Sequence, residues 1–329
     1  MLFSGGGAMP DSLYLAFWNL ENLFDTETAP RPEKLQKVIG KDLAGWDEDL
    51  LALKLAQLAK VICAMNNGAG PDILGVCEVE NVNVLHRLCE AIHSAGGRTY
   101  KVAHADTGDN RGIDVAFLYD PKVAKTSKKE WFQHWVVKRY ATRELFQVNF
   151  SVGDKKLVLI GNHWPSRSAG QYESEPFRII AGETLAYWVE RIHEEQGDDV
   201  GIVVMGDFND EPFNRSLNEY ALGTSDPAQV LAGKNHYLLN LMWPLCGAGQ
   251  GSLLYNGRWN MLDQILVSRG IVAGSSGWTV DGGATIEGRP MIEKKKGSGP
   301  RRFGMGKGKV DVKGFSDHFP VGVRLVGVR

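Results

Sequence analysis

Polar side chains with catalytic potential follow the ends of four apolar runs in the sequence. A Val- and Ile-rich run such as VGIVVM indicates a buried strand, and a buried strand does not hold acidic groups cheaply. We therefore expect these side chains to serve a purpose at the strand ends. In chain order they are Asn19 and Glu21, Glu78 and Glu80, His163, and Asp207 with Asn209 and Asp210.

Two further polar clusters precede apolar runs instead of following them. Asp263 opens DQILVS, and the pair Asp317 and His318 comes before FPVGV. If all six clusters share one site, the last two strands must run opposite to the first four, so the sheets are mixed and not purely parallel. Ligands of open α/β sheets gather at strand ends, which makes one shared polar rim physically reasonable.

The donor set of these clusters fits the hydrolysis of a phosphate ester. The oxygens of Glu78, Asn19, Asp207 and Asp317 suit Mg²⁺ or Mn²⁺, because these ions keep several waters and bind through few carboxylates. A carboxylate held against His318 would fix its tautomer and raise its basicity, as deprotonation of a water near neutral pH requires. A cation, donors to the phosphoryl oxygens and a base are together what this reaction needs.

Each side chain also has a purely structural interpretation. Asn19 could cap a turn, Glu78 could be a solvated strand end, and His163 could be a satisfied hydrogen-bonding histidine. Asp317 and His318 could form a turn before an edge strand. A structural explanation must account for each residue separately, so the ordered set favours function. The ordered arrangement gives the least support for a functional role to three of these polar residues, Glu21, Glu80 and Asp210. We expect them behind the site or in solvent.

Strands punctuated by helices must position these side chains. One apolar stripe from Leu51 to Met65 predicts a helix over 47–66. Further helices are expected over about 82–95, opened by Asn81 as a cap, and over about 176–194. Strands and helices alternate without a composition break, which favours one α/β domain. The expected strands are 13–18, 73–77, 113–119, 157–161, 200–205, 263–267 and 319–326.

The composition of the 329 residues favours a soluble globular chain. No apolar run is long enough for a membrane span, and the start MLFSGGGAMPDS lacks the regions of a secretory signal. We expect a cytoplasmic protein, or a secreted one if a signal was removed. The four cysteines show no CxxC or CxxH spacing, which argues against zinc and against a disulfide framework.

Positive charge gathers in two stretches although the formal net charge is only −2. Residues 289–313 carry nine Lys or Arg and two acids, and residues 122–143 carry seven Lys or Arg and one acid. Such clusters suit a phosphate backbone, although a solvated loop is the ordinary alternative. The basic residues of the first stretch that we expect to contact substrate are Lys294, Lys295, Lys296, Arg301 and Arg302.

Six motifs, in the order WNLEN, CEVEN, NHW, GDFND, LDQILVS and SDHFPV, resemble the endonuclease/exonuclease/phosphatase superfamily. The resemblance runs from about Leu13 to Val326, and GDFND together with SDHFP is its most specific part. It implies a four-layered α-β-β-α sandwich with two mixed β-sheets, as in deoxyribonuclease I. We expect residues 13–329 to form this one domain, with a basic Gly-rich loop at about 289–313, after a flexible segment or tag remnant at 1–12.

The resemblance implies catalytic roles for five residues. Asp207 and Asn209 would orient the attacking water and hold a phosphoryl oxygen. His163 would contact the phosphate and stabilise the developing charge. His318 would be the general base, or a phosphate-contacting cation in some versions of the mechanism, and Asp263 would be its orienting carboxylate.

The resemblance also implies a Mg²⁺ or Mn²⁺ ion with Glu78 as its principal ligand. Asn19 would lie close to Glu78, and Asp317 would lie near the metal. In the segment DNRGIDVAFLYD, Arg111 or Asp114 stands where relatives place further substrate contacts.

One departure from the family pattern concerns the residue before His163. Relatives carry a small residue there, whereas this chain has Asn162. The aromatic residues Trp164 and Trp259 stand beside motif residues and could contact substrate or simply pack. The candidate substrate contacts in the following WPSRSAG are Ser166 and Arg167.

We interpret the sequence as a divalent-metal-dependent phosphodiesterase, a nuclease that hydrolyses DNA or RNA by in-line attack of water. Its partner is then a nucleic acid substrate, and we expect a monomer. Two alternatives stay open: a phosphatase or phosphodiesterase for a small phosphorylated molecule or lipid headgroup, and a nucleic-acid-binding module without catalysis. A lipid-directed enzyme would show an exposed apolar hairpin, and none is evident in the sequence.

Overall fold

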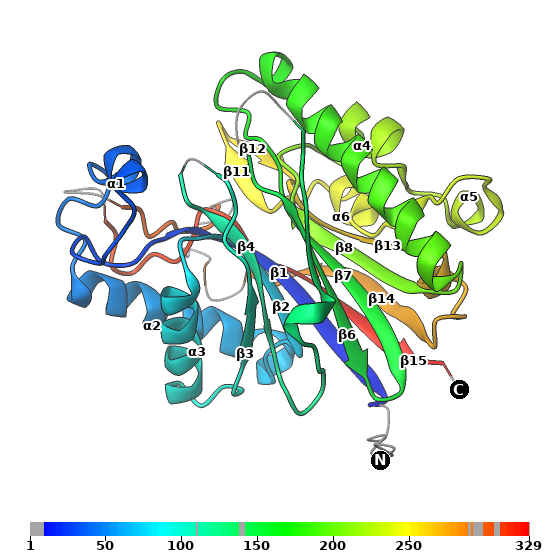
Figure 1. The fold of residues 1–329 in the computed structure, drawn as a ribbon, viewed down its shortest axis with the longest axis horizontal. Coiled ribbons are helices and arrows are strands. Elements are labelled where there is room, and N and C mark those ends of the chain that lie inside the picture. The colour runs from blue at the N-terminus through cyan, green and yellow to red at the C-terminus, as the bar shows by residue number, and fades with distance from the viewer. Residues whose placement is uncertain are drawn as a thin grey trace.

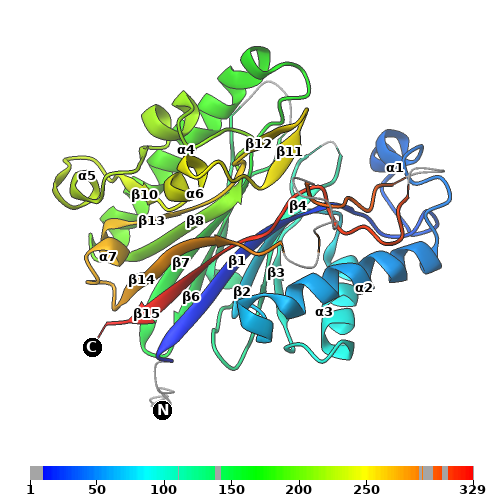
Figure 2. The same ribbon diagram turned by 180° about the vertical axis from the view of Figure 1, so that it is seen from behind.

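Two large β-sheets lie face to face, and helices pack on their outer faces (Figure 1). The structure is a computed structural model that describes residues 10–109, 111–137, 142–288, 291, 299–305 and 310–328. Most of the expected N-terminal segment 1–12 and much of the expected basic loop therefore lie outside the described residues. Figure 2 shows from behind that α2 and α3 cover one sheet, while α4 covers the other.

The first sheet has the strand order β14-β15-β1-β2-β4-β3. β1 (Ser12–Leu23) is parallel to β2 (Ile73–Val79) and antiparallel to β15 (Val321–Gly327). The sheet is therefore mixed. Its other strands are β14 (Trp278–Ile286), β4 (Asp114–Tyr119) and β3 (Lys101–His104).

The second sheet has the strand order β5-β6-β7-β8-β13-β10-β9. β7 (Lys155–His163) is parallel to β8 (Gly201–Asp207), and β13 (Asp263–Val267) is antiparallel to β8. Its other strands are β5 (Trp131–His134), β6 (Leu145–Val152), β10 (Leu238–Asn240) and β9 (Gly223–Thr224). A separate hairpin consists of β11 (Leu253–Tyr255) and β12 (Arg258–Asn260).

Two helices begin at polar residues that the sequence suggests. The Asp47 side chain accepts the Leu50 amide at the start of α2 (Glu48–Ala64), and the Asn81 side chain accepts the Val84 amide at the start of α3 (Val82–Ser94). The other helices are α1 (Glu33–Ile39), α4 (Gln171–Gln196), α5 (Pro227–Ala232), α6 (Trp243–Gly247) and α7 (Arg269–Val272), with short helical turns at Asn66–Gly68, Lys128–Glu130 and Ser216–Tyr220.

Apolar side chains fill each interface between these layers. Leu58 of α2 and Leu85 of α3 pack against the first sheet, while Phe17 and Met205 belong to the core between the sheets. Leu185 of α4 packs against the second sheet. These three cores define a four-layered α-β-β-α sandwich with two mixed sheets, which confirms the expected fold class. The described part of the chain contains no helix whose length and hydropathy would let it cross a bilayer.

The expected strands and helices all exist, but the sequence pattern missed several others. The missed strands include β3, β5, β6 and the short strands β9 to β12. β14 was also missed, because a bulge with Gly282 and Gly283 interrupts its alternation. α4 begins at Gln171, earlier than expected, and contains Pro176 in its second turn. The four cysteines are free, as their spacing indicated.

Gly75 of β2 tests how closely the two sheets approach. An added Cβ would lie 2.7 Å from Cδ2 of Phe17 and 3.1 Å from Sδ of Met205 in the facing sheet. We expect Gly75→Ala to lower the free energy of unfolding by about 1–3 kcal/mol, because overpacking displaces neighbouring side chains. Urea unfolding measures the loss. Gly247→Ala in α6 is the control, since its Cβ meets nothing within 4 Å. Equal losses in both variants would contradict the packing argument.

Candidate active site

Strand register brings predicted residues from both sheets to one edge of the sandwich. In the second sheet, His163 at the end of β7 pairs with Asp207 at the end of β8, and Asp207 pairs with Asp263 at the start of β13. In the first sheet, Asn19 of β1 pairs with the residue that precedes Glu78 in β2. β13 runs against β8 and β15 runs against β1, as the argument for one shared site required.

An amide bridges two carboxylates where the sheets meet. Nδ2 of Asn19 donates to Oδ2 of Asp207 at 3.1 Å and to Oε1 of Glu78 at 3.4 Å. The other Glu78 oxygen accepts the backbone amide of Asn22 at 2.8 Å, while Oδ1 of Asn19 accepts the amide of Glu21. In this arrangement the amide oxygen of Asn19 points away from the carboxylates, so a metal-ligand role for Asn19 requires its amide group to turn.

His318 and Asp263 form a buried pair although 55 positions separate them. Nδ1 of His318 lies 2.6 Å from Oδ2 of Asp263, and Nε2 lies 4.0 Å from Oδ2 of Asp207. Burial alone lowers the pKa of His318, but the carboxylates of Asp263 and Asp207 outweigh burial and raise this pKa well above its usual range. These neighbouring carboxylates favour the protonated form of His318.

His163 has the opposite electrostatic environment. Its Nε2 lies 3.7 Å from Oε1 of Glu78 and 3.9 Å from Oδ2 of Asp207. Burial lowers the pKa of His163 well below its usual range, and the nearby charges of Arg143, Arg111 and His318 add to the effect. Among the described residues, its buried Nδ1 has no hydrogen-bond partner. The pKa shifts of the two imidazoles beside this shared carboxylate thus have opposite directions.

Burial and neighbouring carboxylates disfavour the charged forms of Asp207 and Asp317. Burial raises the pKa of Asp207 to about 7 despite the opposing effect of His318, and burial also raises the pKa of Asp317 to about 6. Glu21 and Glu78 add to the shift of Asp317. A divalent cation prefers such oxygen donors and would relieve this repulsion, so the residues present fit Mg²⁺ or Mn²⁺.

Backbone strain is concentrated at the same place. Glu21, Asn22, Glu78 and Asn209 have φ values between 51° and 61°, in the left-handed region that side chains other than Gly seldom adopt. The strained turn at Asn209 lets its backbone amide donate to Oδ1 of Asp207 at 2.9 Å, while its side-chain amide donates to the carbonyl of Trp164. Such outliers cluster at functional sites, and here they orient the carboxylates.

Glu21, Glu80 and Asp210, which we expected behind the site or in solvent, are buried and hydrogen-bonded to arginines or backbone amides. Glu21 accepts Nε of Arg302 at 2.7 Å and the amides of Phe303 and Gly304 at 2.9 and 3.2 Å. The carboxylate of Glu80 accepts hydrogen bonds from Nε and Nη2 of Arg31, at 2.5 and 2.9 Å. The carboxylate of Asp210 lies against two arginines, Arg178 at 2.7 Å and Arg167 at 3.0 Å. These carboxylates fix the loops that surround the site.

Sequence analysis missed two cations beneath and beside the site. Lys54 of α2 is fully buried, donates to the carbonyl of Glu21, and lies 5.6 Å from the ring centre of Phe303. Arg143 donates to the carbonyls of His163 and Trp164. Lys54 falls on the buried face of α2, between Leu51 and Leu58, so a lysine on the apolar stripe was a signal that the pattern offered. Arg143 precedes a strand that the pattern did not reveal.

The expected substrate contacts fall into three groups. Nη2 of Arg111 donates to Asn22 at 2.5 Å, and the side chain of Arg302 is 64% exposed beside Glu21. Arg167 donates to the carbonyl of Asn209 and pairs with Asp210, so it supports a loop. Ser166 is exposed, and Arg301 pairs with Asp311 at 2.6 Å. Lys294, Lys295 and Lys296 lie outside the described residues.

The unusual Asn162 has a packing role. It is fully buried, donates to the carbonyl of Met205, and accepts Nε1 of Trp164 at 3.0 Å. Trp164 packs edge-on against Phe208 in the core under α4, so it does not face a substrate. Trp259, which is partly buried, stacks on Phe319 at 5.8 Å.

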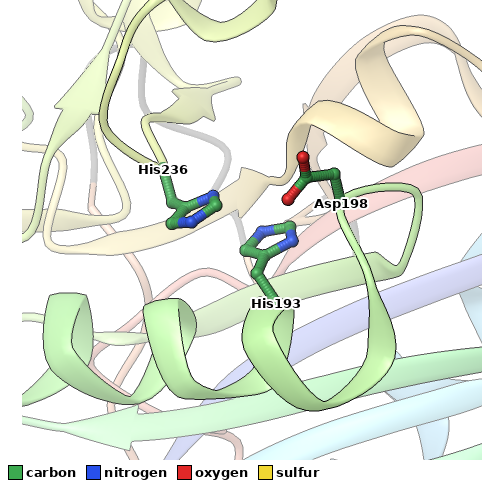
Figure 3. Close-up of side chains that lie close together, drawn as sticks. All are labelled: His193, Asp198 and His236. Atoms are coloured by element: carbon green, nitrogen blue, oxygen red, sulfur yellow. The ribbon is translucent and has the colours of Figure 1, made fainter.

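A second group of possible metal ligands lies far from the strand ends. His193 near the end of α4, Asp198 and His236 approach one another, as Figure 3 shows. The two imidazole rings stack at 4.2 Å with an angle of 10° between their planes. Because nitrogen lone pairs lie in the ring plane, two parallel rings cannot both point at one ion. This cluster therefore does not have the geometry of a metal centre.

A match with a protein family decides what the chain is related to. Residues 14–326, nearly the whole chain, match the Endonuclease/Exonuclease/phosphatase family. The chain belongs to this family. Its members hydrolyse phosphoester bonds and depend on divalent metals. The resemblance on the six motifs is thus confirmed.

Solved structures with the same fold come from several organisms. A humanized TDP2 from D. rerio has 14% identity and a TM-score of 0.59, and it aligns over 96% of this chain and 99% of that chain. A mannosyl-6-phosphatase from Bacteroides thetaiotaomicron has 17% identity and a TM-score of 0.55, and it aligns over 95% of this chain and 99% of that chain. The catalytic domain of human nocturnin has 16% identity and a TM-score of 0.53, and it aligns over 97% of this chain and 95% of that chain. No curated protein matches the sequence.

The pairing of His318 with Asp263 predicts strongly non-additive kinetics. We expect His318→Ala to lower kcat by about 10² to 10⁴, the usual contribution of a positioned acid or base. Asp263→Asn should also lower kcat, because it removes the carboxylate that holds Nδ1. Since the two residues act as one unit, the double variant should be little slower than His318→Ala. Turnover losses that multiply would show that the residues act independently.

Proposed function

We propose that this chain is a Mg²⁺- or Mn²⁺-dependent phosphodiesterase that cleaves DNA or RNA by in-line attack of water. The observation that carries the proposal is the buried pair of His318 and Asp263, whose free nitrogen faces Asp207 beside Glu78. A proton-transfer group next to hard oxygen donors is the arrangement that phosphodiester hydrolysis needs.

Glu78 would hold the divalent ion, with Asn19 and Asp317 close to it. When bound, the ion supplies charge neutralisation at the phosphoryl oxygens. Glu78 suits this role because its Oε2 is fixed by the amide of Asn22, while Oε1 faces Nε2 of His163 at 3.7 Å. The carboxylate is therefore oriented before any ligand arrives.

The opposite pKa shifts divide the remaining roles among the protein groups. Protonated His318 suits the phosphate-contacting version of its role, with Nδ1–H donated to Asp263 and Nε2–H directed at a phosphoryl oxygen. Asp207, with its pKa near 7, is suited to accept the proton of the attacking water near neutral pH. The backbone amide of Asn209 holds Asp207 for this task, and neutral His163 would contact the phosphate.

Solvent-facing arginines beside the site favour a polyanionic substrate. Arg111 and Arg302 contact residues next to the carboxylate cluster, through Asn22 and Glu21 respectively. Both side chains remain partly open to solvent. Contacts of this kind neutralise phosphates along a strand without reading sequence. Together with the basic stretches 122–143 and 289–313, they support a nucleic acid over an uncharged ligand.

A phosphatase acting on a small phosphorylated molecule is the second candidate. A cavity of about 470 Å³ adjoins the segment of Arg111 and is lined partly by Lys34, Asp109 and Asp114. Carboxylates and a lysine in such a cavity would suit a polyhydroxylated group. The structural likeness to a mannosyl-6-phosphatase is consistent with this alternative. Activity toward sugar phosphates without activity toward polynucleotides would establish it.

Removal of the metal is the first test. We expect EDTA to abolish the hydrolysis of plasmid, single-stranded DNA and RNA, and Mg²⁺ or Mn²⁺ to restore it. Glu78→Gln should lose most activity, because a neutral isostere weakens the binding of a divalent ion while preserving shape. Calorimetric titration with Mn²⁺ measures that affinity directly. Undiminished turnover in EDTA-treated protein would exclude a metal-dependent mechanism.

The salt dependence of binding tests the polynucleotide assignment. Arg302→Ala should reduce the slope of log K against log salt by about 0.9 on duplex DNA or about 0.7 on a single strand, because one phosphate contact is lost. Hydrolysis of a small chromogenic phosphodiester should continue. Arg301→Ala in the same segment is the matched control, since that guanidinium pairs with Asp311. An identical slope in wild type and Arg302→Ala would remove this residue from the substrate surface.

A further inference from the structure

Exposed aromatic side chains gather beyond the strand ends that carry the site. Trp135 is 75% exposed, Tyr172 80%, Phe213 52% and Tyr255 65%. Trp135 follows β5, and Tyr172 lies in the first turn of α4. Phe213 lies in the loop after β8, and Tyr255 is the last residue of β11. We call these four residues the rim aromatics. Aromatic surface left in water is costly, and a concentration of it near a site marks a binding surface.

The directions of the strands place three rim aromatics at one edge. β5 is antiparallel to β6, β6 is antiparallel to β7, and β7 is parallel to β8. β5, β7 and β8 therefore all run in the same direction. Trp135, Tyr172 and Phe213 lie beyond their carboxyl ends, which is the edge of the sheet that carries His163 and Asp207.

The fourth rim aromatic is tied to the site through the β11–β12 hairpin. Leu253 of this hairpin forms a bridge with His318, and Oγ of Ser252 accepts the amide of Asp263 at 3.0 Å. Tyr255 ends the same short strand. Figure 1 and Figure 2 both show this hairpin and the amino end of α4 at the same edge of the sandwich.

Register places Trp135 at the level of His163. The pairs His134–Leu145 and Phe146–Gly161, continued along their strands, align Trp135 with Glu144 and Glu144 with His163. Two strand spacings separate the backbones of Trp135 and His163, a distance of roughly 10 Å.

Alternation of side chains then decides which way Trp135 points. Val136 packs with Trp164 in the core under α4, and Asn162 is bonded to Trp164 on that same side. Trp135 and His163, each adjacent to one of these residues, therefore point to the opposite face of the sheet. An exposed indole thus stands on the same face as the phosphate-contacting histidine.

We propose that the rim aromatics form a stacking surface for the unpaired bases of a single strand whose phosphate lies among His163, Asp207 and His318. The inference rests on the proposed function and narrows its substrate to single-stranded nucleic acid. Stacking requires exposed base faces, which a duplex hides, and it tolerates any sequence. The aromatics come from separate loops around the site and two of them carry hydroxyl groups, which favours bases over a lipid bilayer.

Binding of labelled oligonucleotides in EDTA tests the proposal without cleavage. Wild type should bind a 12-nucleotide single strand more tightly than the matched duplex. Trp135→Ala and Tyr172→Ala should each weaken single-strand binding roughly 5- to 100-fold, since base–aromatic stacking is worth about 1–3 kcal/mol. Trp135→Phe should recover most of the affinity. An abasic strand of equal charge should bind wild type at least as weakly as the normal strand binds Trp135→Ala.

Two controls separate this inference from the proposed function. Tyr187→Ala removes an aromatic that is 53% exposed on α4 but away from the rim, and it should change strand binding less than twofold. Tyr187→Ala should also hydrolyse a small chromogenic phosphodiester at the wild-type rate. The stacking surface is wrong if the rim variants lose as much affinity for duplex and abasic strands as for the normal single strand. It is also wrong if Trp135→Ala binds the single strand as tightly as wild type does. Neither result would contradict the proposed phosphodiesterase function.

Two other outcomes would point elsewhere. If the variants lose binding to anionic phosphatidylserine vesicles and keep strand binding, the rim is a lipid surface and the proposal is wrong. If wild type hydrolyses no phosphodiester, or binds no polynucleotide, the proposed function fails together with the inference drawn from it.

Discussion

The buried carboxylate of Asp207 is the constraint on which the rest of the site depends. Its Oδ2 lies 3.1 Å from the amide of Asn19, 3.9 Å from His163 and 4.0 Å from His318. A buried anion is expensive unless polar partners and a cation compensate it, and these partners come from both sheets. Site residues from β1, β7, β8 and β13 therefore have to meet at one edge. Asp263 opens β13 whereas Asp207 ends β8, so these two strands run in opposite directions. The mixed topology is thus the geometric condition for holding this carboxylate.

A second layer of charge keeps the first in place. Glu21, Glu80 and Asp210 lie behind the strand ends, and each holds an arginine or a backbone amide from a distant loop. Lys54 adds a buried positive charge that donates to the carbonyl of Glu21. Through Glu21, the segment around residues 302 to 304 is fixed beside β1, almost 300 positions earlier in the chain. The exposed guanidinium of Arg302 therefore owes its position to a buried acid.

The strand ends and starts allowed mixed sheets and one shared polar rim to be predicted. The four-layered sandwich followed from the family resemblance, and the meeting of Asp263 with His318 followed from that resemblance together with the mixed sheets. The sequence did not reveal the partners of Glu21, Glu80 or Asp210, since a buried ion pair leaves no local pattern and Arg302 lies 281 positions from Glu21. Arg167 shows the same limit. Its place after NHWPS suggested a substrate contact, but its guanidinium holds Asp210 and the carbonyl of Asn209. The exposure of Trp135 also depends on β5, a strand that the apolar pattern did not show.

The two histidines show why position alone does not define a role. His163 and His318 are almost equally distant from Oδ2 of Asp207, yet burial lowers the pKa of His163 while neighbouring carboxylates raise the pKa of His318. Asp263 makes the difference, because it gives His318 a carboxylate at 2.6 Å while Nδ1 of His163 meets no partner among the described residues. A phosphate at this place would meet a charged donor on one side and a neutral imidazole on the other. The two imidazoles thus offer different electrostatic environments, and the carboxylate of Asp263 is the largest source of the raised pKa on the side of His318.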